Sequence, residues 1–362
     1  MSDPQKRRTR GGRVAPTIDD VARHAGVSPM TVSRVINGAP TVREATRQLV
    51  NAAIREIGYQ PNEAARSLAG VRQMHIAMLY AQPSAFIAEF LFGGLEQVKR
   101  HNAQFIIEKC EDIAEAPAEI ERIVSDGADG LLIAPPLADS AAVLDFIESN
   151  DIPAVVVSSS HVRGSICAVG IDAYKAAREM TSHLISLGHR RIGFIAGHPM
   201  HATSELRLAG YRDALGEASL QYRTQFVGQG LYTYRSGLDA AEQLLSLKER
   251  PTAIFASNDE MAAATAAVAH RMGLDVPADL SVCGYDDTPL ATLIWPQLTT
   301  IRVPIAALSR AAADLLVKSI KARERAEERA PQHIVIDYAL IRRQSDAAPR
   351  LRPQPGVAMD AG

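Results

Sequence analysis

Short β-rich runs alternate with amphipathic helical stretches from Met74 onward, and this alternation limits the fold more than any other feature. Runs such as HIAMLY (75–80) and AIFASND (253–259) are separated by expected helices, for example near 89–101 and 173–187. Strand–helix alternation predicts a parallel sheet with helices on both faces. The units are too numerous for one compact open sheet, so we expect two α/β lobes.

The beginning of the chain has a different pattern and a different charge. From Thr17 to Gly58 the sequence predicts short helices with tight turns and no strand. Residues 1–72 contain twelve Lys and Arg against six Asp and Glu, so the remainder of a chain with net charge −2 is acidic. A small basic module joined to a larger acidic one indicates that the first meets a polyanion.

Residues 17–37, TIDDVARHAGVSPMTVSRVIN, carry the marks of a helix-turn-helix unit. Thr17 is placed to cap a first helix, and Gly26 ends that helix in a turn. Ser28 can cap a second helix, and Pro29 suits its first turn. The alternative is a three-helix bundle without a DNA role, and the order of these signals argues against it.

The second helix has an apolar side and an exposed side. Its inward residues are expected to be Val32, Val35 and Ile36. Its outward residues are expected to be Pro29, Met30, Ser33 and Arg34. An arginine and short polar groups near a helix N-terminus suit docking in the major groove of DNA. A third helix is expected after a capping box at residues 41–44, and its core residues would be Leu49, Val50, Ala53, Ile54 and Ile57.

The stretches TIDDVARHAGVSPMTVSRVING and VREATRQLVNAAIREIGYQPNEAARSLAG resemble the N-terminal signature of the lactose-repressor (LacI/GalR) family of bacterial transcription regulators. The resemblance continues to about Arg343. It implies an all-α helix-turn-helix DNA-binding domain, a hinge helix and an α/β two-lobed sensor domain similar to periplasmic sugar-binding proteins. The expected boundaries are 1–15 for a disordered basic tail, 16–60, 61–72 and 73–343 for these three parts, and 344–362 for a second disordered tail.

By the same resemblance, the first lobe holds about 74–170 and 302–330, and the second about 171–301 and 331–343. Pro29 and Met30 match the positions that choose operator bases in the family, and Arg34 matches a base-contacting arginine. Pro29 and Met30 are less polar than typical base readers, so thymine methyl contacts would suit them. The other residues expected at the operator are Thr17, Ser28, Thr31, Ser33, Asn37, Tyr59, Asn62, Ala65 and Leu68.

The expected hinge helix is too short to be stable alone in water. The resemblance implies that two such helices pair in the minor groove, where Leu68 would wedge into a base step and kink the duplex. The alternative from the residues alone is a plain linker with Leu68 packed on the core.

Polar residues follow two strands of the expected sensor domain, in SNDEM (257–261) and GYDDT (284–288). Ligands of such sheets bind at the carboxyl ends of strands. The resemblance places Arg207, Asn258 and Asp286 in an effector pocket, where an arginine fork and a carboxylate could bracket a sugar diol. The other expected effector residues are Tyr232, Tyr80, Phe86, Ser158 and Trp295.

Purely structural roles are the alternative for several of these residues. Asn258 and Asp286 could be caps, Arg207 a surface ion pair, and Tyr232 and Trp295 core aromatics. The family often has an aspartate where Ser158 stands, so this chain departs from the family pattern at that position. Phe90 is a further candidate for the first-lobe side.

The sequence lacks the motifs that are typical of several other function classes. The sequence has no GxSxG elbow, HExxH motif or Walker loop, so we expect neither an enzyme nor a cofactor. We expect no metal site, because the histidines near one another in sequence lack a supporting carboxylate at helical spacing. The three cysteines lie far apart in apolar stretches, as in a reduced cytosolic protein. No apolar run is long enough to span a bilayer.

The sequence therefore predicts a cytoplasmic, nucleoid-associated repressor that binds a pseudopalindromic operator as a homodimer. We expect its effector to be a sugar or glycoside. The alternatives are the same architecture sensing a nucleobase or another small metabolite as corepressor, and a transport-type binding protein or enzyme on the same lobes.

Overall fold

The chain divides into two compact units, residues 1–73 and 74–362. The computed structural model describes residues 16–36, 42–59, 73–158, 166–327 and 330–350. None of the helices in these ranges is both long and apolar enough to cross a membrane.

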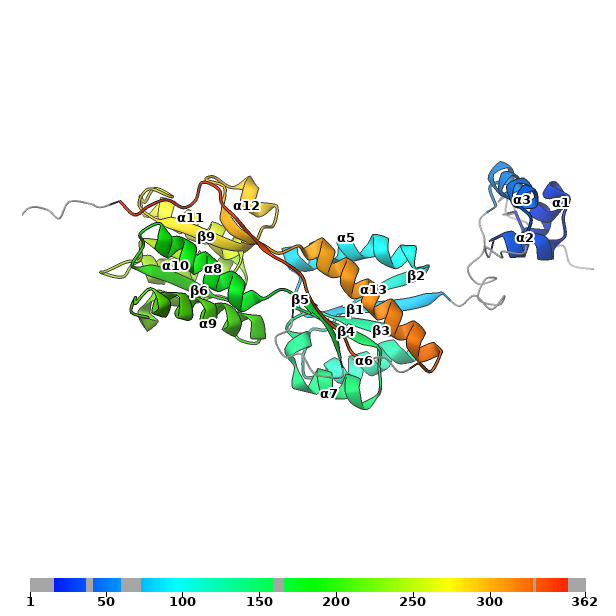
Figure 1. Cartoon of the computed structure of the whole chain (residues 1–362), viewed down its shortest axis with the longest axis horizontal. Coiled ribbons are helices and arrows are strands. Elements are labelled where there is room, and N and C mark those ends of the chain that lie inside the picture. The colour runs from blue at the N-terminus through cyan, green and yellow to red at the C-terminus, as the bar shows by residue number, and fades with distance from the viewer. Residues whose placement is uncertain (1–15, 37–41, 60–72, 159–165, 328–329, 351–362) are drawn as a thin grey trace, which may run out of the picture. The chain divides into compact units, whose positions relative to one another are not determined.

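Three helices form the described part of the first unit: α1 (Ile18–Ala25), α2 (Pro29–Ile36) and α3 (Glu44–Ile57), blue in Figure 1. Thr17 and Asp20 cap α1 reciprocally, each side chain bonding the other residue's backbone N–H. Gly26 ends α1 in the left-handed region, with φ of 64°. The buried core comprises Val21, Ala22, Val32, Val35, Val50 and Ala53.

Two expectations for this unit are wrong. The N-cap of α3 is Arg43, which makes no side-chain cap bond, and Thr41 of the expected capping box lies outside the described residues. Leu49 is 59% exposed and does not close the core. Val50 and Ala53, with Ile54 and Ile57 packed beside them, already complete the inward stripe of α3.

The first lobe of the second unit is built on a parallel sheet of order β11-β5-β4-β3-β1-β2. Its strands are β1 (Met74–Tyr80), β2 (Ala103–Lys109), β3 (Gly130–Ile133), β4 (Ala154–Val157), β5 (Cys167–Gly170) and β11 (His333–Val335). One face packs on α5 (Ala85–Arg100) and α13 (Ile305–Glu324), the other on α6 (Ala116–Ser125) and α7 (Ala141–Ser149). A short 3-10 turn, η1 (Leu137–Asp139), follows β3.

The second lobe has a sheet of order β12-β10-β9-β8-β6-β7, in which β12 alone runs antiparallel to its neighbour. Its strands are β6 (Ile192–Ala196), β7 (Val227–Gln229), β8 (Ala253–Ala256), β9 (Ser281–Asp286), β10 (Thr299–Arg302) and β12 (Ala339–Ile341). Helices α8 (Ala173–Ser186) and α9 (Ala202–Glu217) pack as one pair, and α10 (Tyr234–Leu245) and α11 (Asp259–Arg271) as another. The short elements are η2 (Thr224–Phe226) and α12 (Leu290–Leu293).

The predicted two-lobed α/β architecture is confirmed, with one correction to its boundaries. The chain crosses between the sheets after β5, after β10 and after β11. The run 331–343 was expected in the second lobe, but its first half, β11, pairs in parallel with β5 of the first lobe. A single apolar run thus supplies an edge strand to each sheet.

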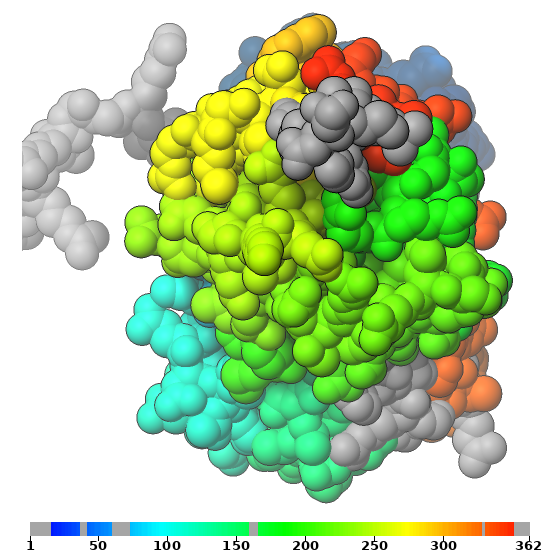
Figure 2. Space-filling view, turned by 90° about the vertical axis from the view of Figure 1, so that its left-hand side faces the viewer, coloured from blue at the N-terminus to red at the C-terminus, as the bar shows by residue number. Residues whose placement is uncertain are grey.

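The expectation of a disordered tail from 344 is wrong for residues 344–350. Ser345 is fully buried: its hydroxyl donates to the carbonyl oxygen of Val282 at 2.5 Å and accepts from the N–H of Thr299 at 2.8 Å. Asp346 pairs with His183 of α8 at 2.6 Å. Figure 2 shows this red segment lying against the green and yellow parts of the second lobe. Residues 351–362 lie outside the described part of the chain.

Candidate functional site

The exposed face of α2 is the first candidate site. Ser28 precedes the helix, and its Oγ accepts from the Thr31 N–H at 3.1 Å and lies 2.9 Å from the Thr31 hydroxyl. Met30 is 64% exposed, and Pro29 and Arg34 are exposed beside it. The helix therefore presents an arginine and an apolar pair outward from a capped N-terminus, a geometry that fits the major groove.

The structure describes only some of the remaining predicted operator residues. Thr17 is the exposed cap of α1, Ser33 is half-buried on α2, and Tyr59 packs at the edge of the small core. Four others lie outside the described residues: Asn37, Asn62, Ala65 and Leu68. The wedge role of Leu68 stays a prediction.

The second candidate site is a pocket between the two lobes. Its walls come from segments that follow the carboxyl ends of strands, as in other open parallel sheets. Ser158 follows β4 in the first lobe. Asn258 follows β8, and Asp286 ends β9, in the second lobe. Two lobes that share one pocket can couple ligand binding to their relative position.

Arg207 of α9 occupies the second-lobe wall between aromatic rings. Its guanidinium carbon lies 3.7 Å from the ring centre of Tyr285 and 5.5 Å from that of Tyr232. One Nη donates to the carbonyl oxygen of Ser257. These contacts hold the positive charge at the pocket and satisfy part of its hydrogen-bonding capacity.

Asp286 faces the same pocket at the end of β9. Burial raises the pKa of Asp286 to about 8, although the Arg207 guanidinium opposes the shift. Its φ of 104° lies in the region that L-residues rarely adopt, and the next residue, Asp287, has φ of 58°. A carboxyl group held in such a turn matches the pattern of a functional position.

Asn258 is a cap as well as a lining residue. Its side-chain oxygen accepts from the N–H of Met261 at 3.0 Å, and its amide nitrogen donates to the carbonyl oxygen of Tyr232 at 2.9 Å. The alternative interpretation of Asn258 as a helix cap is therefore right about the cap, but Asn258 lines the pocket as well. The same side chain also fixes the loop that carries Tyr232.

A histidine that sequence reasoning left out also lines this pocket. The His201 ring centre lies 5.0 Å from that of Tyr232 and 5.5 Å from that of His198. Burial, followed by the neighbouring His198 and Arg207, lowers the pKa of His201 to about 4. The available signal was its position between β6 and α9, at the carboxyl end of a strand.

Several polar atoms around the pocket have no hydrogen-bond partner within the described part of the chain. Arg207 Nε, Tyr232 Oη and Tyr285 Oη belong to lining residues, and Ser204 Oγ lies on α9 outside the lining; all four atoms are buried. Burying such groups without a partner costs free energy. A ligand with hydroxyl groups could satisfy those that face the cavity.

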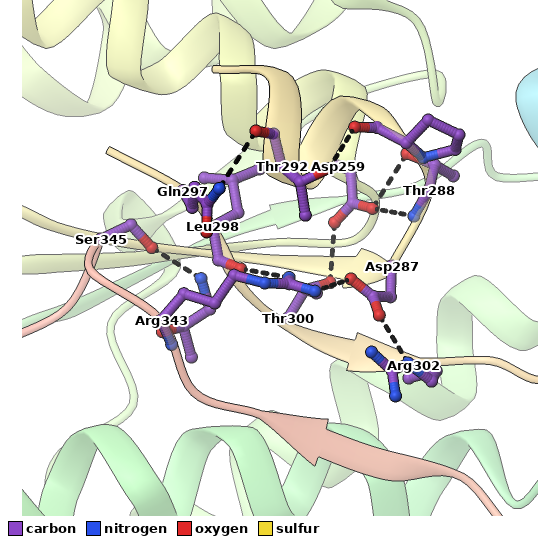
Figure 3. A network of polar contacts seen from close by, with 12 residues as sticks. Asp259, Asp287, Thr288, Thr292, Gln297, Leu298, Thr300, Arg302, Arg343 and Ser345 are labelled. Atoms are coloured by element: carbon purple, nitrogen blue, oxygen red, sulfur yellow. Dashed lines mark hydrogen bonds and ion pairs between the residues drawn. The ribbon is translucent and has the colours of Figure 1, made fainter. Parts of the chain in front are cut away.

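Two further aspartates, Asp259 and Asp287, have structural roles instead (Figure 3). Asp259, buried at the start of α11, accepts bonds from Thr288 and Thr300, and burial raises its pKa to about 6. Asp287 lies 2.6 Å from both Arg302 and Arg343. This carboxylate therefore ties β10 and the segment after β12 to the turn that carries Asp286.

The predicted effector residues fall into two groups. Those that line the pocket are Arg207, Asn258, Asp286, Tyr232, Phe86 and Ser158. Tyr80 and Trp295 are absent from the lining. Tyr80 packs half-buried against the core at the end of β1, and Trp295 is 78% exposed after α12. Phe90 is fully buried core.

No group of three His, Cys, Asp or Glu side chains suited to a metal ion occurs in the ranges that the structure describes. His183 and His189, both near one another in sequence, bond to the C-terminal segment instead.

Comparisons with known proteins match both units of the chain. A family model described as bacterial regulatory proteins, lacI family, matches residues 17–62, and one described as a periplasmic binding protein-like domain matches 181–345. Catabolite control protein A of Priestia megaterium is 34% identical over 307 residues, which cover 83% of this chain and 92% of that protein. The chain belongs to the lacI family of bacterial regulatory proteins.

Solved structures of lacI-family regulators share the whole architecture. A transcriptional regulator CelR–cellobiose complex matches with 31% identity and a TM-score of 0.70, over 91% of this chain and 99% of that one. A Lac repressor dimer bound to operator and the anti-inducer ONPF matches with 27% identity and a TM-score of 0.76, over 92% and 100%. The family resemblance expected from the sequence is thereby confirmed.

Proposed function

We propose that this lacI-family regulator is a dimeric, operator-binding repressor whose DNA affinity is set by a sugar or glycoside bound between its lobes. The observation that carries the proposal is the presence, on one chain, of an outward-facing α2 and of a two-lobed pocket with unpartnered polar groups. Such a protein acts on nucleoid DNA in the bacterial cytoplasm and needs no catalytic group.

The DNA side of the proposal rests on the exposed face of α2, and the family resemblance adds the hinge residues. Arg34 would read a base edge, while Pro29 and Met30 would contact thymine methyl groups. Asn37, Tyr59, Asn62 and the hinge residues Ala65 and Leu68 would contact the backbone and the minor groove.

The effector side rests on Arg207 and Asp286. A guanidinium and a carboxyl group on one wall can bracket neighbouring hydroxyls of a sugar, and Tyr232 offers a ring for its apolar face. The related CelR structure was solved with cellobiose, which favours a carbohydrate here. Phe86 and Ser158 would complete the first-lobe side.

The two sites would be coupled through the lobes. Effector binding changes the angle between the lobes and therefore the spacing of the two hinges in a dimer. A difference of about 1.4 kcal/mol between the two states changes operator affinity tenfold.

A nucleobase corepressor is the second candidate, because the His201 and Tyr232 rings offer aromatic faces on which a base could stack. A thermal-shift comparison separates the two: stabilisation of the full chain by hypoxanthine or guanine, and by no sugar, would favour the nucleobase.

In vitro selection of operator sequences, followed by binding in rising salt, tests the repressor function. We expect a pseudopalindromic site and a steep loss of affinity with salt. Arg34→Ala should reduce specific affinity by about tenfold to a hundredfold and relax the preference at one base position. Arg55→Ala, a matched loss of charge on the exposed side of α3, should spare that preference.

Leu68→Ala should weaken specific binding much more than nonspecific binding, since the wedge acts only on the bent operator. Selection that yields no palindrome, or an unchanged ratio of specific to nonspecific affinity in Leu68→Ala, would count against the proposal.

A further inference from the structure

His201 occupies the N-cap position of α9 but makes no cap bond. Helix N-caps are usually Ser, Thr, Asp or Asn, whose side chains satisfy a free backbone N–H. Four other helices of the sensor unit follow that rule, with caps at Ser84, Asp172, Thr233 and Asn258. The N-cap side chains of α6, α7, α12 and α13 make no cap bond either, but only at α9 does such an N-cap side chain line the pocket in the described residues.

The imidazole of His201 is uncharged at neutral pH, because burial and its charged neighbours keep its pKa near 4. A neutral imidazole offers one N–H donor and one acceptor nitrogen. A hydroxyl group likewise donates once and accepts, so the two match. The ring also extends the aromatic wall that begins at Tyr232.

The charges around the pocket disfavour an anionic ligand. Asp259 and Glu260 line it, and Asp286 is largely protonated at neutral pH, whereas Arg207 is the sole permanently charged cation among its described lining residues. One nitrogen of that guanidinium is already bound to the carbonyl oxygen of Ser257. A phosphate group would therefore meet more carboxyl groups than free cationic donors.

The N-terminus of α9, which would otherwise attract a phosphate, is already occupied. The Asp139 carboxylate of the first lobe accepts from the Ala202 N–H at 3.0 Å. This contact also joins η1 to α9 across the lobes. An anion entering here would have to displace a carboxylate that the protein itself supplies.

We propose that His201 is a specificity-determining residue that selects an uncharged, hydroxyl-bearing ring, and that the pocket rejects phosphorylated forms of the same sugars. This inference rests on the proposed effector site and narrows its ligand class. His201 pairs with a ring hydroxyl, Tyr232 covers the ring face, and Asp139 closes the helix end against anions.

The first test compares matched ligands on the full-length protein by calorimetric titration. The neutral probes are glucose, galactose, maltose and cellobiose. The anionic partners are glucose 6-phosphate, galactose 6-phosphate and cellobiose 6′-phosphate, with hypoxanthine as a separate control. We expect binding of at least one neutral sugar and at least a hundredfold weaker binding of its phosphate. A phosphate that binds as tightly as its neutral partner overturns the inference, as does hypoxanthine binding or the failure of every neutral sugar.

The second test uses His201→Asn. Asparagine restores a good N-cap, so the thermal midpoint should rise, while affinity for the neutral sugar should fall about tenfold. His198→Asn is the matched control: His198 lies in the same aromatic cluster but is not a lining residue, so affinity should stay within twofold. Unchanged affinity in His201→Asn overturns the specificity role.

Operator binding separates this inference from the proposed function. If a phosphorylated sugar releases the protein from its selected operator, the repressor function stands and the inference fails. If sugars bind selectively but no operator is selected, the proposed function fails and the ligand class stands.

Discussion

At the scale of single residues, two adjacent aspartates show how position decides the role of a carboxyl group. Asp287 is compensated by two arginines, each at 2.6 Å. Asp286 has no such pairing in the described residues, and burial raises its pKa to about 8. The Asp287 carboxylate therefore stabilises the turn. The Asp286 carboxyl group destabilises it but faces the ligand pocket.

This contrast predicts a pH-dependent gain in stability for Asp286→Asn. In the folded state Asp286 binds its proton up to about pH 8, whereas an unfolded aspartate releases it near pH 4. Wild-type stability from this group is therefore present at low pH and is lost as pH rises from about 4 to 8. Asparagine does not titrate in this range and tolerates positive φ. The stability of Asp286→Asn should therefore increase relative to that of the wild type as pH rises across that range.

Urea unfolding of both proteins from pH 5 to pH 8 measures this effect. Because the Asp286 carboxyl is partly open to the pocket, we expect a relative gain of about 1 kcal/mol over the range. Asp239→Asn, at a 62% exposed side chain on α10, is the control and should show no trend. A difference that stays flat with pH would contradict the shifted titration of Asp286.

At the scale of elements, the sequence predicted regular features well. Hydrophobic alternation located most strands of both lobes and the helices between them, but not β10 or α13. Thr17 and Gly26 mark the two ends of α1, as expected. These features are local: periodicity and caps depend on neighbours within a few residues. Strand ends then led to the stretches 257–261 and 284–288, because ligand positions in parallel sheets follow from topology. The family resemblance singled out Asn258 and Asp286 within these stretches.

Features that depend on distant partners were missed. The run 331–343 reads as one strand, and its division between β11 and β12 depends on which sheet edge each half meets. His201 resembles a loop histidine until α9 and Tyr232 are placed around it. The segment after Arg343 has a polar, proline-containing composition, yet Ser345 and Asp346 insert between β9, β10 and α8.

The C-terminal segment gives a prediction at this scale. Ser345→Ala removes the hydroxyl that pairs the Val282 carbonyl and the Thr299 N–H, and leaves both buried groups unsatisfied. We expect a loss of about 2 kcal/mol in the free energy of unfolding of the sensor unit, measured in urea. Ser246→Ala, at the exposed end of α10, should cost less than about 0.5 kcal/mol. Equal effects of the two variants would show that the segment does not stabilise the second lobe.

At the scale of the whole molecule, exposed apolar side chains support the proposed dimer. Leu293 and Trp295, in and just after α12, are each 78% exposed, and Phe92 of α5 is exposed to the same extent. Figure 1 shows α5 and α12 along the upper side of their lobes. Large apolar groups exposed on both lobes fit a surface that a second copy covers.

Trp295 provides a direct measurement of this association, because it is the only tryptophan in the chain. If a second copy covers α12, the Trp295 emission maximum should move to shorter wavelength as protein concentration rises through the dimer dissociation constant. Leu293→Asp should abolish that shift, since a carboxylate in a closed apolar interface loses its hydration. The thermal midpoint of the diluted protein should stay the same, because Leu293 is exposed in the single chain. The sequence-based expectation that Trp295 is an effector residue makes the opposite prediction: an emission shift on adding sugar at fixed protein concentration, and none on dilution.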